Sequence, residues 1–141
     1  MSYSVLPAGE AFWRPSNMLK TLNTDLAKQL GAQTLGARLW RLRPGEFSTR
    51  HRHYETHELY LVLEGEGRMR IGTDSLVLPR LSAVLVEPQE VRQIFNDTDA
   101  DALWYVVGAP AEPANTLEMS EETLAFIYPD GPKVPPPELA P

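Results

Sequence analysis

Apolar and polar residues alternate with a period of two through the middle of the chain. Trp40 and Leu42 fall on one face of the segment 38–43, while Arg41 and Arg43 fall on the other, which is typical of a β-strand. Similar short segments recur about every ten residues, separated by turn-forming residues, at 58–64, 68–71, 75–78, 83–86, 91–96 and 103–107. This succession of about seven short strands predicts an all-β sandwich or barrel.

The two ends of the chain have a different pattern. A capping residue, Asn23 or Thr24, opens a short pattern that ends at Gly31, which predicts one short helix. An acidic first turn predicts a second short helix over 120–126. The last twelve residues hold five prolines and predict an extended tail, able to lie over a neighbouring subunit. The chain thus divides into an N-terminal segment with an edge strand and a helix, a barrel core, and a C-terminal segment: 1–36, 37–110 and 111–141.

Charge and composition exclude several classes of function. The net charge is −6, from 13 basic and 19 acidic residues, which opposes sequence-blind binding to nucleic acid. The chain has no cysteine, which rules out disulfides, thiol nucleophiles and cysteine-bound zinc. No apolar run approaches the length of a membrane span, and the first residues do not resemble a signal sequence. We therefore expect a cytoplasmic protein with no membrane partner.

All three histidines of the chain lie within seven residues of one another. His51 and His53 are two positions apart, so their side chains point to the same side of an extended chain. Glu58 follows shortly and can supply a carboxylate from the adjoining strand. Two imidazoles and one carboxylate, with open coordination positions, suit Fe(II), Mn(II), Zn(II) or Ni(II). The candidate metal ligands are therefore His51, His53 and Glu58.

Strand alternation also assigns the neighbours of Glu58. Tyr60 shares its face and is a candidate substrate contact, whereas His57 points away or sits at the mouth of the strand. The apolar positions that alternate on these strands are expected to form the barrel core, among them Tyr60, Val62, Met69, Ile94 and Trp104. Arginines recur in the same region and are expected on a solvated strand face or in ion pairs across a subunit interface: Arg38, Arg41, Arg43, Arg50 and Arg52.

The spacing of these residues resembles the first conserved motif of the cupin family. Its positions are occupied by Gly45, His51, His53, Glu58 and Gly65. The resemblance covers residues 37–108 and implies a double-stranded β-helix, a small jelly-roll barrel with short helices at its ends. It also implies that the two histidines and the glutamate bind a metal together with a histidine of a second motif. Related cupins pair into dimers, often through the N-terminal strand, so a homodimer is expected.

The second cupin motif is where the chain departs from the family. Pro88 and Asn96 are kept, but Arg92 occupies the position of the histidine. A guanidinium stays protonated and has no lone pair to give a metal, so Arg92 cannot be the fourth ligand. Numerous small cupins of unassigned activity are similar in having arginine here, which implies a subtype. His57 remains as an alternative source of the lost ligand.

Two interpretations of the site stay open. In the first, His51, His53 and Glu58 hold Fe, Mn, Ni or Zn, and Arg92 binds an anionic substrate group beside the ion. In the second, Arg92 pairs with Glu58, no metal binds, and the lumen captures a small carboxylate or phosphate. A bidentate pair between Arg92 and Glu58 would favour the second interpretation.

Three functions follow, and the sequence leaves open whether the chain is an enzyme. The first is a metal-dependent oxygenase, isomerase or decarboxylase that acts on a small organic acid or sugar. The second is a non-catalytic, metal-free module that binds a small anion through Arg92. The third is a structural cupin with a vestigial pocket. One barrel serves many activities, so the function has to be argued from the site.

Overall fold

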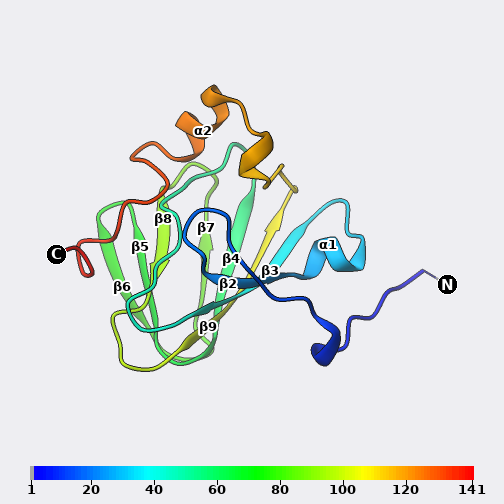
Figure 1. Cartoon of the computed structure of the whole chain (residues 1–141), viewed down its shortest axis with the longest axis horizontal. Coiled ribbons are helices and arrows are strands. Elements are labelled where there is room, and N and C mark those ends of the chain that lie inside the picture. Colours follow the sequence, from blue (N-terminus) through cyan, green and yellow to red (C-terminus); the bar gives the residue numbers. More distant parts are fainter. Residues whose placement is uncertain (1) are drawn as a thin grey trace.

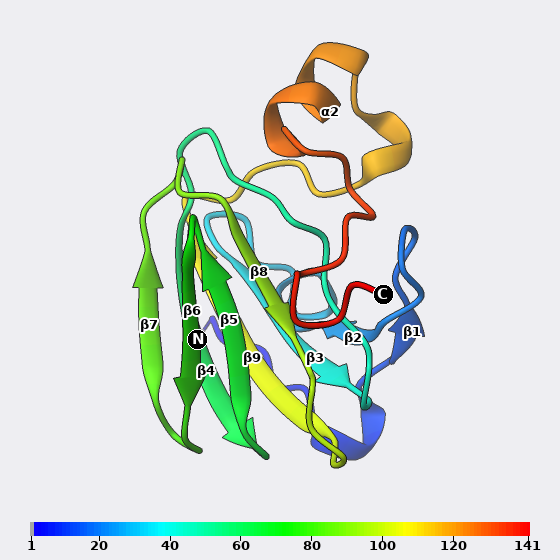
Figure 2. The same cartoon turned by 90° about the vertical axis from the view of Figure 1, so that its left-hand side faces the viewer.

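Two antiparallel sheets face one another in the computed structural model, which describes residues 2–141 (Figures 1 and 2). Within these residues the larger sheet has six strands in the order β1-β2-β3-β9-β4-β7, and the smaller has three in the order β6-β5-β8. The strands are β1 (Arg14–Pro15), β2 (Leu22–Asp25), β3 (Gly36–Leu42), β4 (His57–Glu64), β5 (Gly67–Ile71), β6 (Asp74–Leu78), β7 (Ala83–Val86), β8 (Arg92–Phe95) and β9 (Ala102–Ala109). All paired neighbours run antiparallel. The all-β prediction is confirmed, and each expected barrel strand is found to within about two residues at its ends.

The loop 43–56 between β3 and β4 extends the smaller sheet. Phe47 pairs with Phe95, and His51 pairs with Arg92, as isolated antiparallel bridges along β8. The loop leaves the larger sheet at β3 and returns to it at β4, so it carries the chain across to the smaller sheet and back. This crossing places the loop at the rim of the barrel, next to both sheets.

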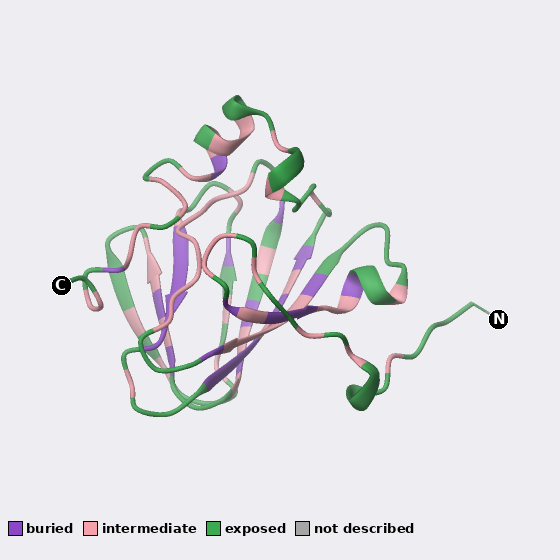
Figure 3. Ribbon diagram, viewed as in Figure 1, coloured by how far each residue is buried: buried purple, intermediate pink, exposed green. Residues whose placement is uncertain are grey.

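The core lies where the inner faces of the two sheets meet (Figure 3). Its buried members come from both sheets: Leu42, Tyr60, Val62, Met69, Val86, Ile94, Ala102, Trp104 and Val106. All five positions that alternation assigned to the core belong to this cluster. Burial of each larger apolar side chain contributes about 1.5–3 kcal/mol, which holds the sheets together without a disulfide.

The helix near the N-terminus begins later than its sequence pattern predicts. Helix α1 (Leu26–Leu30) is capped by Asp25, whose Oδ1 accepts from the backbone N–H of Lys28 (2.9 Å). The predicted cap at Asn23 or Thr24 is wrong, because both residues lie in β2 and pair with β3. Gly31 ends the helix with a φ of 74°, as predicted from its tolerance of the left-handed region.

The segment after β9 forms a cover at one end of the barrel (Figure 2). It contains a 3-10 turn, η2 (Thr116–Glu118), and the helix α2 (Glu121–Ile127). Ser120 caps α2 by accepting from the backbone N–H of Thr123 (3.1 Å), and the acidic first turn favours the positive end of the helix. The predicted second helix is therefore confirmed. Within residues 2–141 no helix is both long and apolar enough to cross a membrane.

The proline-rich tail, for which the sequence predicts an extended segment, packs against its own barrel. It turns back against its own chain beside β5 and β8 (Figures 1 and 2). Gln93 Nε2 donates to the carbonyl of Val134 (2.8 Å), and Arg70 forms an ion pair with Glu138 (2.9 Å). Proline removes backbone freedom from the unfolded chain, so a few such contacts are enough to hold the segment.

Candidate metal centre

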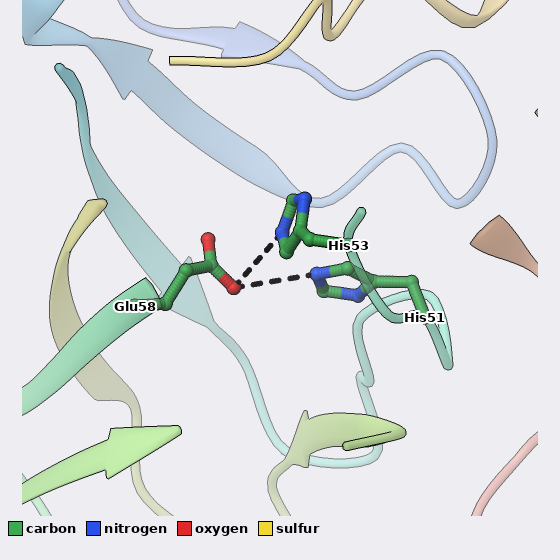
Figure 4. Close-up of side chains that lie close together, drawn as sticks. All are labelled: His51, His53 and Glu58. Carbon is green, nitrogen blue, oxygen red and sulfur yellow. Dashed lines mark ion pairs between the residues drawn. The ribbon is translucent and has the colours of Figure 1, made fainter. Parts of the chain in front are cut away.

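Three side chains with ligand atoms meet at one end of the barrel (Figure 4). The Nε2 atoms of His53 and His51 lie 3.1 Å and 3.6 Å from the same oxygen, Glu58 Oε1. One ligand atom from each residue lies within 4.8 Å of the other two. Across residues 2–141 this is the one group of three or more such side chains gathered so closely. The structure therefore brings together the three residues that the sequence predicts as ligands.

The extended backbone of the loop explains why both histidines point inward. His51 exchanges two backbone hydrogen bonds with Arg92 on β8, and the backbone N–H of His53 donates to the carbonyl of Pro88 (2.7 Å). The side chains of successive residues on such a chain alternate between its two sides. Arg52 and Tyr54 therefore point outward, where both contact the ring of Phe126 on α2.

The hydrogen bonds around the imidazoles leave both Nε2 atoms directed at the cluster. His51 Nδ1 is 3.1 Å from the carbonyl oxygen of Thr49, which accepts the ring proton when Nε2 gives its lone pair to a metal. His53 Nε2 is buried and has no hydrogen-bond partner within residues 2–141, despite its closeness to Glu58. A buried nitrogen without a partner is costly unless something else binds it. This nitrogen, together with His51 Nε2 and a carboxylate oxygen, fits a divalent transition metal.

Glu58 is held in the charged form that a metal requires. Burial raises the pKa of this carboxyl, but hydrogen bonds and charge from His51 and His53, when these carry protons, outweigh burial and hold the pKa well below its usual range. A bound metal ion would take the place of those protons. The hydroxyl of Tyr60 donates to Glu58 Oε1 (2.8 Å). Burial and the charge of Glu58 raise the pKa of Tyr60 well above its usual value, so the phenol keeps this proton.

Arg92 lies in the barrel wall rather than on its inner surface. Its side chain is 0 % exposed, and its terminal nitrogens donate to the carbonyls of Glu87 (2.7 Å) and Pro88 (3.2 Å). Its Nε is 3.8 Å from Glu58 Oε1, which is too long for a hydrogen bond. The bidentate pair that would favour a metal-free site is not formed. Arg92 is not among the described residues that line the cavity.

His57 points away from the cluster. It is half exposed, and its Nδ1 pairs with Glu87 (3.0 Å) on the outside of β4. This orientation follows from strand alternation, because Glu58 is the next residue and points inward. His57 therefore does not replace the lost fourth ligand.

The cluster faces a cavity of about 1030 Å³ whose wall is bare beside Glu58. In the sheet, Glu58 pairs with Gly108 on β9, and Gly108 pairs with Gly36 on β3. On this side of Glu58, β9 and β3 thus place no side chain in its row, whereas on the other side Val86 of β7 pairs with it. A Cβ on Gly108 would lie 2.6 Å from Thr56 Cγ2 and 3.2 Å from Glu58 Cγ. Glycine at this position therefore keeps the space beside the ligand open.

The next row of residues on the same face brings a cation into the cavity. Tyr60 pairs with Val106, and Val106 pairs with Arg38. The guanidinium of Arg38 donates to Asn23 Oδ1 (2.7 Å) and pairs with Asp25 (3.0 Å). This ion pair lies within the chain, and the sequence analysis did not place Arg38 in the lumen. Alternation puts Arg38 on the same face of the strand as Trp40, and this was the sequence signal that Arg38 points into the cavity, which both residues line.

Sequence analysis also missed Glu112, which follows β9 and lines the cavity near His53. Its carboxylate accepts hydrogen bonds from residues 54–56, which lie between the candidate ligands His53 and Glu58. Burial raises the pKa of Glu112, but the hydrogen bonds from Thr56, Glu55 and Tyr54 outweigh it and lower the pKa. No local sequence signal marks this residue, because its partners lie more than fifty residues away.

Solved structures with similar folds belong to proteins of several descriptions. A sugar phosphate isomerase from a cupin superfamily of Silicibacter pomeroyi DSS-3 is 24% identical, with a TM-score of 0.69 over 77% of this chain and 76% of that one. KdgF from Halomonas sp. is 15% identical, with a TM-score of 0.68 over 79% and 96% of the two chains. A predicted oxalate decarboxylase from Thermotoga maritima is 20% identical, with a TM-score of 0.65 over 77% and 100%. At these identities the likeness shows the double-stranded β-helix fold.

The family follows from a direct match to the sequence. A search of curated proteins finds no match. The model of the cupin domain family matches residues 38–108, which run from β3 to β9 and include all three residues of the metal cluster. The barrel, the paired histidines and the matched span lead to one conclusion: this chain belongs to the cupin family.

Proposed function

We propose that this chain is a metal-dependent cupin enzyme that acts on a small organic acid or sugar in the barrel lumen. His51, His53 and Glu58 hold a divalent ion, which is Fe, Mn, Ni or Zn. The observation that supports this most is the convergence of both Nε2 atoms on Glu58 Oε1, with His53 Nε2 buried and lacking a hydrogen-bond partner in the described chain. Two histidines and one carboxylate with open positions are the ligand set of non-haem Fe(II) oxygenases, and the isomerase and decarboxylase classes stay open beside it.

When bound, the ion supplies a Lewis acid that polarises an oxygen of the substrate. The residues of the chain then have separate tasks. Glu58 stays ionised. Tyr60 keeps its proton and donates a hydrogen bond to Glu58 Oε1, which fixes the direction of the carboxylate. Tyr60 also lines the cavity, so its ring borders the substrate beside the cluster.

The charge of the cavity favours an anionic ligand once a metal is present. Its cationic side chains are Arg14, Lys28 and Arg38, and its carboxylates are Asp25, Glu58 and Glu112. These charges balance, so a divalent ion makes the interior positive and attracts an anion. Neighbouring strands are about 4.8 Å apart, so Arg38 lies two strands, or about 10 Å, from Tyr60 along its row. Arg38 thus binds the anionic group of the substrate, the role that the sequence predicts for Arg92. Arg92 instead holds the barrel wall behind Glu58.

The test is to measure metal per chain in the untagged protein by mass spectrometry, because a histidine tag would itself bind metal. We expect about one divalent ion per chain, and its loss in the His51→Ala/His53→Ala double variant. The matched control is His57→Ala. It removes the third histidine, which lies on the outer face of β4, and this variant should still bind the ion. If no ion binds after incubation with Fe, Mn, Ni and Zn in turn, the metal-dependent function is wrong. A metal-free site for small anions, sought by thermal shift, then takes its place.

We also propose that the chain forms a homodimer. The N-terminal arm projects from the barrel with Tyr3 and Val5 largely exposed (Figure 1). On the outer face of the larger sheet, Leu59 on β4 pairs with Leu85 on β7, and both are exposed. Exposed apolar residues that adjoin on a sheet are typical of an interface. Light scattering after gel filtration gives the mass directly, and a Leu59→Glu/Leu85→Glu variant should shift it from dimer to monomer.

A further inference from the structure

One carboxylate fastens the segment after β9 to the loop that joins the metal ligands. Glu112 Oε1 accepts from the backbone N–H of Tyr54 (3.1 Å), and Oε2 accepts from the N–H groups of Glu55 (2.8 Å) and Thr56 (2.6 Å). The hydroxyl of Thr56 adds a fourth hydrogen bond to Oε2 (2.6 Å). The carboxylate is largely buried, with 13 % of the side chain exposed. Hydrogen bonds to a shielded carboxylate are stronger than those between neutral groups.

The position of these partners along the chain links Glu112 to the ligands. Residues 54–56 are three of the four residues that separate His53 from Glu58. Their N–H groups belong to no strand, and Glu112 fixes their direction. The spacing between an imidazole and a carboxylate that must meet the same ion is therefore set by a residue from another part of the chain.

Glu112 also lies beside the ring of His53. Its Oε1 is 3.9 Å from His53 Nδ1, on the side of the ring away from Glu58. When Nε2 gives its lone pair to a metal, the ring proton sits on Nδ1, and the negative charge of Glu112 stabilises it there. The carbonyl of Thr49 does the same for His51. The carbonyl of Thr49 is thus at hydrogen-bond distance from Nδ1 of His51, whereas Glu112 acts on Nδ1 of His53 through its charge at 3.9 Å. An oxygen on the Nδ1 side usually accompanies metal-ligating histidines.

We infer that Glu112 is a positioning residue that sets the tautomer and orientation of the metal ligand His53. The inference rests on the proposed metal site but concerns a residue outside the span that matches the family model, 38–108. Glu112 is not itself a ligand in this arrangement, because it faces Nδ1 and does not belong to the close group of ligand atoms. The C-terminal segment therefore takes part in building the metal site.

The experiment compares metal affinity in the full-length protein, its Glu112→Gln and Glu112→Ala variants, and a Glu118→Gln control. Glu118 is an exposed carboxylate in the same segment. With Zn²⁺ in a chelator competition, we expect affinity to fall about 10- to 100-fold in Glu112→Ala, less in Glu112→Gln, and not at all in the control. Circular dichroism checks that the barrel is folded, and Glu112→Gln keeps the test usable if Glu112→Ala does not fold.

A second readout is independent of metal affinity. Nitrogen-15 chemical shifts of the imidazoles in the metal-free protein report the tautomer of each histidine. We expect the share of the Nδ1-protonated tautomer of His53 to fall in both Glu112 variants relative to the wild type, while that of His51 is unchanged.

The outcomes separate the two proposals. If the wild type binds Zn²⁺ and both Glu112 variants bind it equally well with an unchanged His53 tautomer, the positioning role is overturned and the metal site stands. If the wild type itself binds no metal, the metal site is wrong, and the positioning of a metal ligand fails with it.

Discussion

His51 and Arg92 face each other as direct antiparallel partners. The backbone N–H of His51 donates to the carbonyl of Arg92 (3.0 Å), and the N–H of Arg92 donates to the carbonyl of His51 (2.8 Å). This pairing puts residue 92 beside a metal ligand, where the resemblance to other cupins implies a fourth one. The guanidinium instead turns to the carbonyls of Glu87 and Pro88 and braces the loop before β8.

Two substitutions of Arg92 separate the effect of its hydrogen bonds on stability from the effect of its charge on metal binding. Arg92→Met removes the charge without adding a ligand, whereas Arg92→His also adds an imidazole. Both variants should lose about 1–3 kcal/mol of unfolding free energy, because the buried carbonyls of Glu87 and Pro88 lose their donors. Both should bind Ni²⁺ or Zn²⁺ more tightly, since a positive charge near Glu58 opposes a cation, and the histidine variant should gain about tenfold more.

Thermal unfolding and calorimetric titration measure the two effects. A methionine variant that binds metal no more tightly than the wild type would show that the guanidinium does not oppose the ion. A histidine variant no better than the methionine variant would show that residue 92 cannot reach it.

A methyl group at Gly108 should disturb the metal centre. The new Cβ would press on Thr56 and on the side chain of Glu58, so Gly108→Ala should cost about 1–3 kcal/mol and weaken metal binding. Gly36→Ala is the matched control, because Gly36 lies in the same row and its Cβ would meet no heavy atom of the described residues within 4 Å. Melting temperatures of the two variants, with and without metal, check the prediction. Equal behaviour would refute it.

The ring of Phe126 holds α2 against the loop of the metal ligands. Tyr54 stacks on it with ring centroids 4.0 Å apart, and the guanidinium carbon of Arg52 lies 4.1 Å from its centroid. Phe126→Ala should cost about 2 kcal/mol and speed amide hydrogen exchange in α2 and residues 51–56. The exposed Leu117, replaced by alanine, is the control in the same segment. Faster exchange confined to α2 would show that the loop is held by other contacts.

Arg38 and Arg41 lie on opposite faces of β3 and form a natural pair for testing the substrate cation. Arg38 lines the cavity, whereas Arg41 pairs with Glu64 and Asp101 outside the lumen. In the metal-loaded protein, Arg38→Ala should weaken binding of a small dicarboxylate such as succinate by about tenfold, and Arg41→Ala should leave it unchanged. Thermal-shift titrations measure both affinities, and equal losses would place the anion elsewhere.

The docked tail should loosen in acid. Burial raises the pKa of Glu138, but hydrogen bonds from Arg70 and Ser75 outweigh it and lower the pKa from 4.5 to about 2. The ionised form therefore stabilises the folded state fully above pH 4.5, and this contribution is lost as the pH falls from 4.5 toward 2. Glu138→Gln should remove about 1 kcal/mol or less at neutral pH and flatten the acid dependence. Unfolding curves between pH 6 and pH 3, followed for both proteins, test this; parallel curves would contradict it.

Much of the fold and part of the site could be predicted from local patterns. Period-two alternation located the barrel strands, because one face of each strand is buried and the other is exposed to solvent. The same periodicity placed His51 and His53 together, turned Glu58 inward and turned His57 outward. Errors arose where short polar segments gave no pattern: Asn23 and Thr24 form a strand, not a helix cap.

By itself, the sequence determined the succession of strands, the core positions and the three ligand-type residues, because these depend on neighbours a few positions apart. Only the tertiary structure decided that Arg92 braces the wall, that Arg38 enters the lumen and that Glu112 reaches the loop beside His53. Each of these is a contact between side chains and segments that lie far apart in the chain. Such contacts depend on how the sheets, the loop and the C-terminal segment pack against one another, which no local pattern encodes.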